Sequence, residues 1–165
     1  MEMDSLRKLY VDELKDLYSA DKQILQALPR MAKKADNEKL KKAFEEHVRV
    51  TEKQVERLDR IFEKLGKAAR GKKCKGMEGL IEEGKEMMQE DMEPEVMDAA
   101  LIAACQRIEH YEMAGYGTVR TYAQILGEDD HAKLLQQTLD EEGNADKLLT
   151  QLAESQINVE AVQEA

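Results

Sequence analysis

Residues 101–126, LIAACQRIEHYEMAGYGTVRTYAQIL, have the pattern that recurs along this chain. Large apolar residues return in alternating steps of three and four, which is the spacing of the buried face of a bundle helix. Glu112 interrupts the middle of that face, and Glu109 lies one turn earlier on the same side. The stretch therefore predicts a bundle helix that carries two acids at mid-length, on a face expected to be core.

Three other segments repeat this arrangement of an apolar stripe with polar residues near its centre. In the first long segment of the chain the exception is Asp21, and in the second the polar positions begin with His47. The last segment has Glu142 and Asp146, which are neighbours on one helix face because they are four residues apart. Four helices with polar residues at matched depth predict one polar layer inside the bundle.

Capping and helix-stopping residues indicate where these segments begin and end. Asp4 or Ser5 is the expected N-cap of the first helix, Gly66 ends the second, and Pro94 suits the first turn of the fourth. Residues 158–165 are expected to fray. The predicted helices span residues 4–35, 38–65, 77–89, 94–126 and 129–156.

The lengths of the connections predict the topology. Tight links join the first two and the last two long helices, so each pair is expected to form an antiparallel hairpin. The connector at residues 66–93 is long enough to run the length of the bundle and contains the short helix. We therefore predict one all-α domain over residues 1–165, a ferritin-like up-down-down-up four-helix bundle with a short extra helix in the long crossover.

Composition restricts the classes of partner. The formal net charge of −10 argues against DNA binding through phosphates, which needs an excess of Lys and Arg. No apolar run reaches the ~18 residues of a membrane span, and the polar N-terminus does not resemble a signal peptide. Cys74 and Cys105 form no CxxC pair, so we expect reduced thiols rather than a zinc-thiolate site. A bacterial or archaeal cytoplasm is the expected location.

The polar layer is the candidate functional site. Unpaired buried carboxylates cost several kcal/mol each, and the four stripes contain no Lys or Arg that would neutralise them. A bound cation would resolve the conflict; a watered polar core, or a site that has lost its metal, are the alternatives. Carboxylates with one imidazole suit iron or manganese best and zinc less well, and such a bundle site holds two ions. The predicted metal ligands are Asp21, His47, Glu109, Glu112, Glu142 and Asp146.

Several neighbouring residues are candidates for a supporting role. Tyr18, His110 and Tyr116 lie near the predicted ligands in sequence and could hydrogen-bond them, although packing alone would also explain the tyrosines. His131, near the start of the last helix, is expected at the surface. Glycine inside a helix is costly, so Gly115 and Gly117 predict the close approach of another helix, for example at a dimer interface.

The segment at residues 66–76, GKAARGKKCKG, is rich in Lys and Gly. The simplest interpretation is a solvated loop. The alternative is a basic patch that binds an anionic partner.

Five stretches resemble the YciF/YciE family of bacterial stress-induced proteins. They are LYSADKQILQALPRMA, AFEEHV, GMEGLIEEG, DAALIAACQRIEHYEMAGYGT and LLQQTLDEEGNADKLLTQLA. The resemblance covers nearly the whole chain and implies a ferritin-like fold similar to rubrerythrin, a dimer and a di-iron centre. The family's biochemical activity is not established.

The resemblance also assigns residues. Asp21 stands where the family usually has glutamate, and His47 matches the family's histidine. Glu109 and Glu112 look like the Glu-x-x-Glu pair of rubrerythrin-like proteins, and Glu142 with Asp146 matches the acidic pair of the last helix. The Glu-x-x-His motifs usual on the second and fourth bundle helices are absent. These departures leave fewer ligands on the second helix.

Three hypotheses follow. The first is a di-metal bundle protein of the bacterial stress response that binds iron, or else manganese or zinc, and handles iron, peroxide or oxygen. As an enzyme it would be a di-iron oxidoreductase of the ferroxidase or peroxidase type. The second is a non-enzymatic dimeric stress protein with a structural or vestigial polar core. The third is anion binding by the basic segment at residues 66–76. A homodimer is expected, without nucleic-acid or membrane partners.

Overall fold

The computed structural model describes residues 4–163, and every regular element in this part of the chain is helical. The elements are α1 (Leu6–Lys34), α2 (Glu38–Leu65), α3 (Lys75–Met88), α4 (Pro94–Ile125), α5 (Asp129–Leu152), the π-helical turn η1 (Ala153–Ile157) and α6 (Asn158–Gln163). The predicted all-α class is confirmed. Between residues 4 and 163, no helix is long and apolar enough to cross a membrane.

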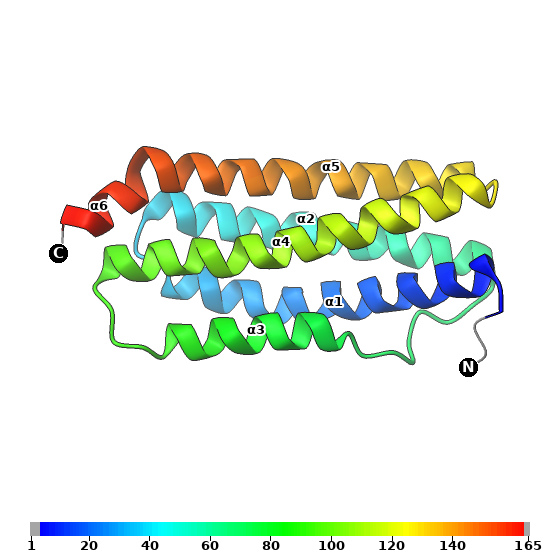
Figure 1. Ribbon diagram of the computed structural model, residues 1–165, viewed down its shortest axis with the longest axis horizontal. Coiled ribbons are helices and arrows are strands. Elements are labelled where there is room, and N and C mark those ends of the chain that lie inside the picture. Colours follow the sequence, from blue (N-terminus) through cyan, green and yellow to red (C-terminus); the bar gives the residue numbers. More distant parts are fainter. Residues whose placement is uncertain (1–3, 164–165) are drawn as a thin grey trace.

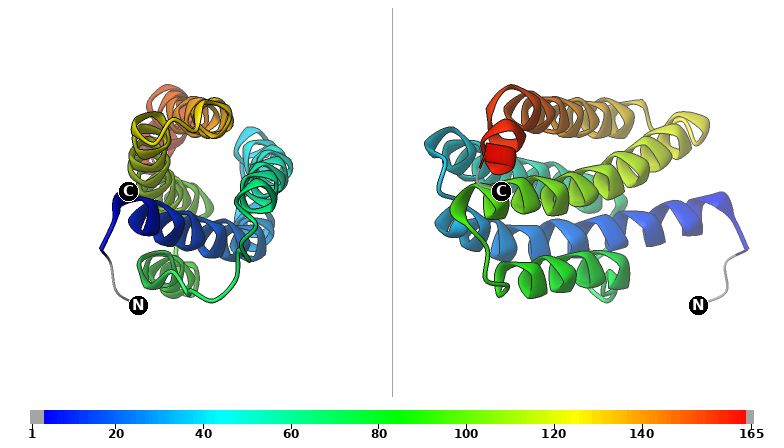
Figure 2. Two further views of the ribbon diagram at one scale, coloured as in Figure 1. Left: turned by 90° about the vertical axis from the view of Figure 1, so that its right-hand side faces the viewer. Right: turned by 60° about the vertical axis from the view of Figure 1, so that its left-hand side comes forward.

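The four long helices surround a common core, with α3 outside it (Figures 1 and 2). The hairpin of α1 and α2 packs beside the hairpin of α4 and α5, and α3 lies against α1 and α4. Because the connector through α3 runs back along the bundle, α2 and α4 point in the same direction (Figure 1). This is the predicted up-down-down-up order with one long crossover.

The helix ends follow local chemistry. The Ser5 side chain accepts a hydrogen bond from the backbone N–H of Lys8 and begins α1. Asn37 likewise caps α2, which ends at Gly66 with a left-handed φ of 65°. Pro94 occupies the first turn of α4, where its missing N–H costs no helical hydrogen bond.

The C-terminal segment differs from the expectation that it frays. Residues 158–163 form α6, after a π-helical turn that ends α5. Ile157 in that turn is almost completely buried and packs into the core cluster formed with α1, α2 and α4, which ties the segment to the bundle. Residues 164 and 165 lie outside the described part of the chain.

Two apolar clusters make up the core. One contains Leu14 of α1, Ile61 of α2 and Val119 of α4, and the other contains Leu28 of α1 and Leu101 of α4. Buried polar residues of the stripes lie where the two clusters meet, with Asp21 of α1 between Leu17 of one cluster and Ile24 of the other. The polar layer is therefore closed from both ends of the bundle by packed apolar side chains.

Two contacts fix how the hairpins meet. The Asp98 carboxylate on α4 accepts the backbone N–H groups of Asp36 and Asn37 at 2.8 and 2.9 Å, which ties the α1–α2 turn to the other hairpin. A Cβ at Gly115 would lie 2.6 Å from Cδ2 of the buried Leu17, so glycine is needed for α4 to pack on α1. The close approach predicted for Gly115 is therefore within the chain, whereas a Cβ at Gly117 would meet only Leu139 Cδ2, at 4.0 Å.

Candidate metal centre

Three of the predicted ligands meet in the polar layer, each from a different helix. His47 Nε2 of α2 lies 3.0 Å from Glu109 Oε1 of α4 and 3.6 Å from Glu142 Oε2 of α5. One ligand atom from each residue lies within 4.8 Å of the others. The side chain of His47 is 9% exposed and those of Glu109 and Glu142 are 1% exposed. This buried group, the His47 triad, has a spacing that could hold a metal ion.

Two further ligands form a pair beside the triad. Asp21 of α1 and Glu112 of α4 are completely buried, and their carboxyl groups face one another. The Tyr116 hydroxyl donates to Asp21 Oδ2 and holds that side chain in place. Glu112 lies one turn after Glu109 on the same face of α4, so the carboxyl pair and the triad are neighbours.

Most of the oxygens in this layer have no hydrogen-bond donor among the described residues. The five buried atoms concerned are Asp21 Oδ1, Glu109 Oε2, Glu112 Oε1, Glu112 Oε2 and Glu142 Oε2. Buried acceptors without donors are costly, and carboxylates accept but do not donate unless protonated. Oxygen acceptors with a single imidazole suit a hard or borderline divalent cation, so the residues present fit a metal.

Burial and the close approach of like charges also raise pKa values in the layer. Burial raises the pKa of Asp21 to about 6, against the opposing effects of its hydrogen bonds. Burial, and then the charge of Asp21, raise the pKa of Glu112 well above its ordinary value. Burial alone would lower the pKa of His47, but the charge and hydrogen bond of Glu109, together with the charges of Asp21 and Glu141, outweigh burial and the pKa rises. Without a metal, protons therefore partly neutralise the layer.

One predicted ligand lies outside the group. Asp146 follows Glu142 by one turn, but its Oδ1 lies 3.2 Å from Nε2 of the exposed His110. The two residues form a contact between α5 and α4 at the edge of the bundle. His110 therefore lies beside Asp146 rather than beside the triad.

The two predicted tyrosines have different positions. Tyr116 contacts the layer through Asp21. Tyr18 does not reach it: its ring packs edge-on against Phe62 at 6.1 Å between centroids, and it lines a surface cleft. Tyr18 makes no hydrogen bond to a predicted ligand among the described residues, because its side chain is directed toward Phe62 and Asp59 of α2.

A buried arginine was missed by the stripe pattern. Arg57 of α2 donates to both carboxylate oxygens of Glu141 at 2.6 and 2.8 Å, and to Thr138 at 3.0 Å. Gln54 also donates to Glu141 at 3.3 Å. The absence of Lys and Arg from the stripes was therefore misleading, although the Arg57 charge is already paired with Glu141. In the sequence, only the run of polar residues through Gln54 indicates that this part of α2 makes buried polar contacts.

His131 is also not where the sequence predicted it. It is 3% exposed, and its Nδ1 lies 3.0 Å from the Tyr10 hydroxyl of α1. Burial lowers the pKa of His131 and favours the neutral ring, whose Nδ1 shares a hydrogen bond with the Tyr10 hydroxyl. The start of α5 packs against α1, which explains why a polar residue near a helix end is buried.

The comparisons with known proteins agree over the full length. The sequence matches the family described as "Domain of unknown function (DUF892)" over residues 5–162. Protein YciF of Escherichia coli K12 is 44% identical, with both chains covered completely.

Solved structures match equally well. The crystal structure of the E. coli stress protein YciF superposes with a TM-score of 0.91 at 44% identity, covering 94% of this chain and 99% of that one. YcfI from Rhodopseudomonas palustris gives a TM-score of 0.87 at 39% identity, covering 91% and 97%. A Xanthomonas campestris protein at 23% identity, with a TM-score of 0.77 and coverage of 96% and 97%, shares the fold. The chain belongs to the DUF892 family, the family of the stress protein YciF.

Proposed function

We propose that this protein is a stress-response bundle protein whose polar layer binds two ions of iron or manganese. The observation that carries the proposal is the set of five buried carboxylate oxygens without a donor. A dry layer of this kind is unfavourable unless protons or cations occupy it. The relationship to the E. coli stress protein YciF supports the stress role.

The residues divide into two neighbouring sets. His47, Glu109 and Glu142 would hold one ion, and Asp21 with Glu112 would hold the other. Iron bound there would supply redox chemistry toward peroxide or oxygen. Tyr116 orients Asp21, while the apolar clusters above and below the layer exclude water. The protons held by Asp21 and Glu112 would leave when metal binds.

Metal binding can be measured directly. Protein stripped with a chelator is titrated with Mn²⁺, and with Fe²⁺ without oxygen, and bound metal is counted after equilibrium dialysis. We expect two ions per chain in the wild type. Glu109→Gln and Glu142→Gln keep side-chain size but remove charge, and each should lower binding at least tenfold. Asp146→Asn is the matched control, since Asp146 pairs with His110 outside the triad. Metal-free wild type at millimolar metal would refute the proposal.

The second candidate function is a non-enzymatic protein with a structural polar core. It is favoured by the ion pair of Arg57 with Glu141, a buried polar contact between α2 and α5 that needs no metal. Peroxide consumption by metal-loaded protein separates the two functions. Consumption that disappears in Glu109→Gln supports an oxidoreductase, whereas metal-loaded protein without any turnover leaves a structural role for the ion.

A further inference from the structure

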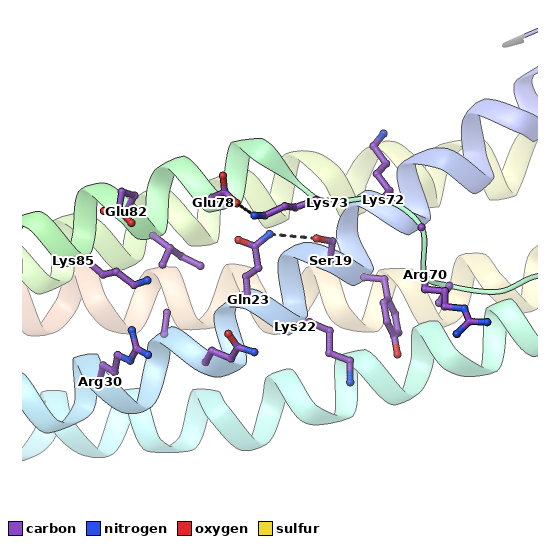
Figure 3. Close-up of a pocket in the computed structure, with 16 residues that line it drawn as sticks. Ser19, Lys22, Gln23, Arg30, Arg70, Lys72, Lys73, Glu78, Glu82 and Lys85 are labelled. Carbon is purple, nitrogen blue, oxygen red and sulfur yellow. Dashed lines mark hydrogen bonds and ion pairs between the residues drawn. The ribbon is translucent and has the colours of Figure 1, made fainter. Parts of the chain in front are cut away.

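We propose that a cleft between α1 and α3 binds a small anion with several phosphate groups. The cleft has a volume of about 550 Å³, within the range of ligand sites. Its walls are α1, α3 and the loop that leads into α3 (Figure 3). It lies on the outside of the bundle, and nothing in the metal proposal uses it.

The charge of the cleft is opposite to that of the protein. Six Lys or Arg residues line it against two Glu, whereas the whole chain carries a net charge of −10. Concentrated positive charge in a concave surface raises the local concentration of anions. Four of the cations form no ion pair with an acid of residues 4–163: Lys22, Arg30, Arg70 and Lys85.

These four cations are distributed along the cleft, and Lys22 Nζ lies 5.4 Å from the centroid of the Tyr18 ring. Arg30 of α1 and Lys85 of α3 extend into it from opposite walls at one end (Figure 3). Lys22 lies eight residues before Arg30, or roughly 12 Å along the helix axis, and Arg70 is at that second end. A single phosphate cannot contact both ends. An extended anion with several phosphates can.

The other two cations hold the wall of the cleft. Lys72 pairs with Asp12 of α1, and Lys73 pairs with Glu78 of α3. The Ser19 hydroxyl accepts the backbone N–H of Cys74 at 2.8 Å, which fixes the end of the loop to α1. These contacts preorganise the cleft, so binding does not require ordering of the loop.

The floor offers a neutral donor and an apolar surface. Ser19 Oγ accepts two hydrogen bonds, from Cys74 and Gln23, and its own proton has no acceptor among the described residues. The side chains of Tyr18, Ala27 and Ile81 supply apolar lining. The same phosphate chemistry could come from an inorganic polyphosphate or from a nucleotide whose base contacts that lining.

The test is binding by isothermal titration calorimetry to metal-free protein, with phosphate, tripolyphosphate and ATP as probes. We expect tripolyphosphate to bind at least tenfold more tightly than phosphate, with affinity falling as salt rises. Arg30→Gln with Lys85→Gln should weaken it at least tenfold. The control is Lys133→Gln with Lys147→Gln, two exposed residues of α5 that change the net charge equally. ATP binding that Tyr18→Ala weakens while tripolyphosphate binding is unchanged assigns the site to nucleotides; equal binding of both probes assigns it to the phosphate chain.

Three results would overturn the proposal. The first is equal loss of affinity in the α5 control, which would show diffuse attraction rather than a site. The second is unchanged tripolyphosphate binding in the Arg30 and Lys85 variant. The third is a single-stranded oligonucleotide that binds much more tightly than tripolyphosphate, which would reject a small-molecule site. Because the metal-free protein is used, failure here leaves the metal proposal untouched.

Discussion

Replacing Asp21 by asparagine should stabilise the metal-free protein near neutral pH. Asp21 is completely buried, and burial raises its pKa from 3.8 to about 6. Since the folded pKa is above the unfolded value, the carboxyl destabilises the fold as pH rises from 3.8 to about 6, and the penalty is constant above that. A shift of this size corresponds to about 3 kcal/mol at pH 7.

Asparagine removes the charge with little change of shape. Its oxygen can still accept the Tyr116 hydroxyl, and its amide can donate to Glu112, whose carboxyl oxygens have no donor. We therefore expect the variant to gain up to about 3 kcal/mol in the free energy of unfolding at pH 7, and almost nothing at pH 4. With metal the order should reverse, because an ion at about 1,000 times its dissociation constant adds about 4.1 kcal/mol to the wild type only.

The assay is urea unfolding followed by circular dichroism, from pH 4 to pH 8, with chelator and with Mn²⁺. Asp146→Asn serves as the control for loss of one acid outside the carboxyl pair. A variant less stable than wild type in chelator at pH 7, or one with the same pH dependence as wild type, would contradict the proposed energetics of the layer.

Three further predictions concern packing and pH. Gly115→Ala should destabilise the bundle by about 1–3 kcal/mol, because its Cβ would lie 2.6 Å from Leu17. Gly143→Ala should stabilise it by about 0.5–1 kcal/mol, because a Cβ there would have nothing within 4 Å. The urea midpoints of the two variants measure the difference. Asp98→Ala should cost about 2–4 kcal/mol in the free energy of unfolding, since two backbone N–H groups at the α1–α2 turn lose a charged acceptor, and amide exchange there should accelerate. Burial lowers the folded pKa of His131, so this side chain should make the fold less stable as pH falls below about 6.5. His131→Gln should lack this contribution, which is measured as the change, between pH values of about 7.5 and 5.5, in the difference of unfolding free energy between wild type and variant.

Local pattern was sufficient for the fold and for most of the polar layer. The steps of three and four place Asp21, His47, Glu112 and Glu142 on the inner faces of their helices, because helix periodicity fixes which residues share a face. All four are buried at the middle of the bundle. Connection lengths likewise predicted the crossover, since a tight link can only return a helix beside its neighbour.

The other features of the structure depend on contacts between helices, which cannot be predicted from the pattern along a single helix. Arg57 is buried because Glu141 of α5 lies opposite, and His131 is buried because Tyr10 of α1 faces it. The basic cleft exists because the crossover folds α3 back against α1, so cations far apart in the sequence line one surface. The helix faces follow from the sequence through the fixed period of the helix, whereas partners across helices depend on how the hairpins dock.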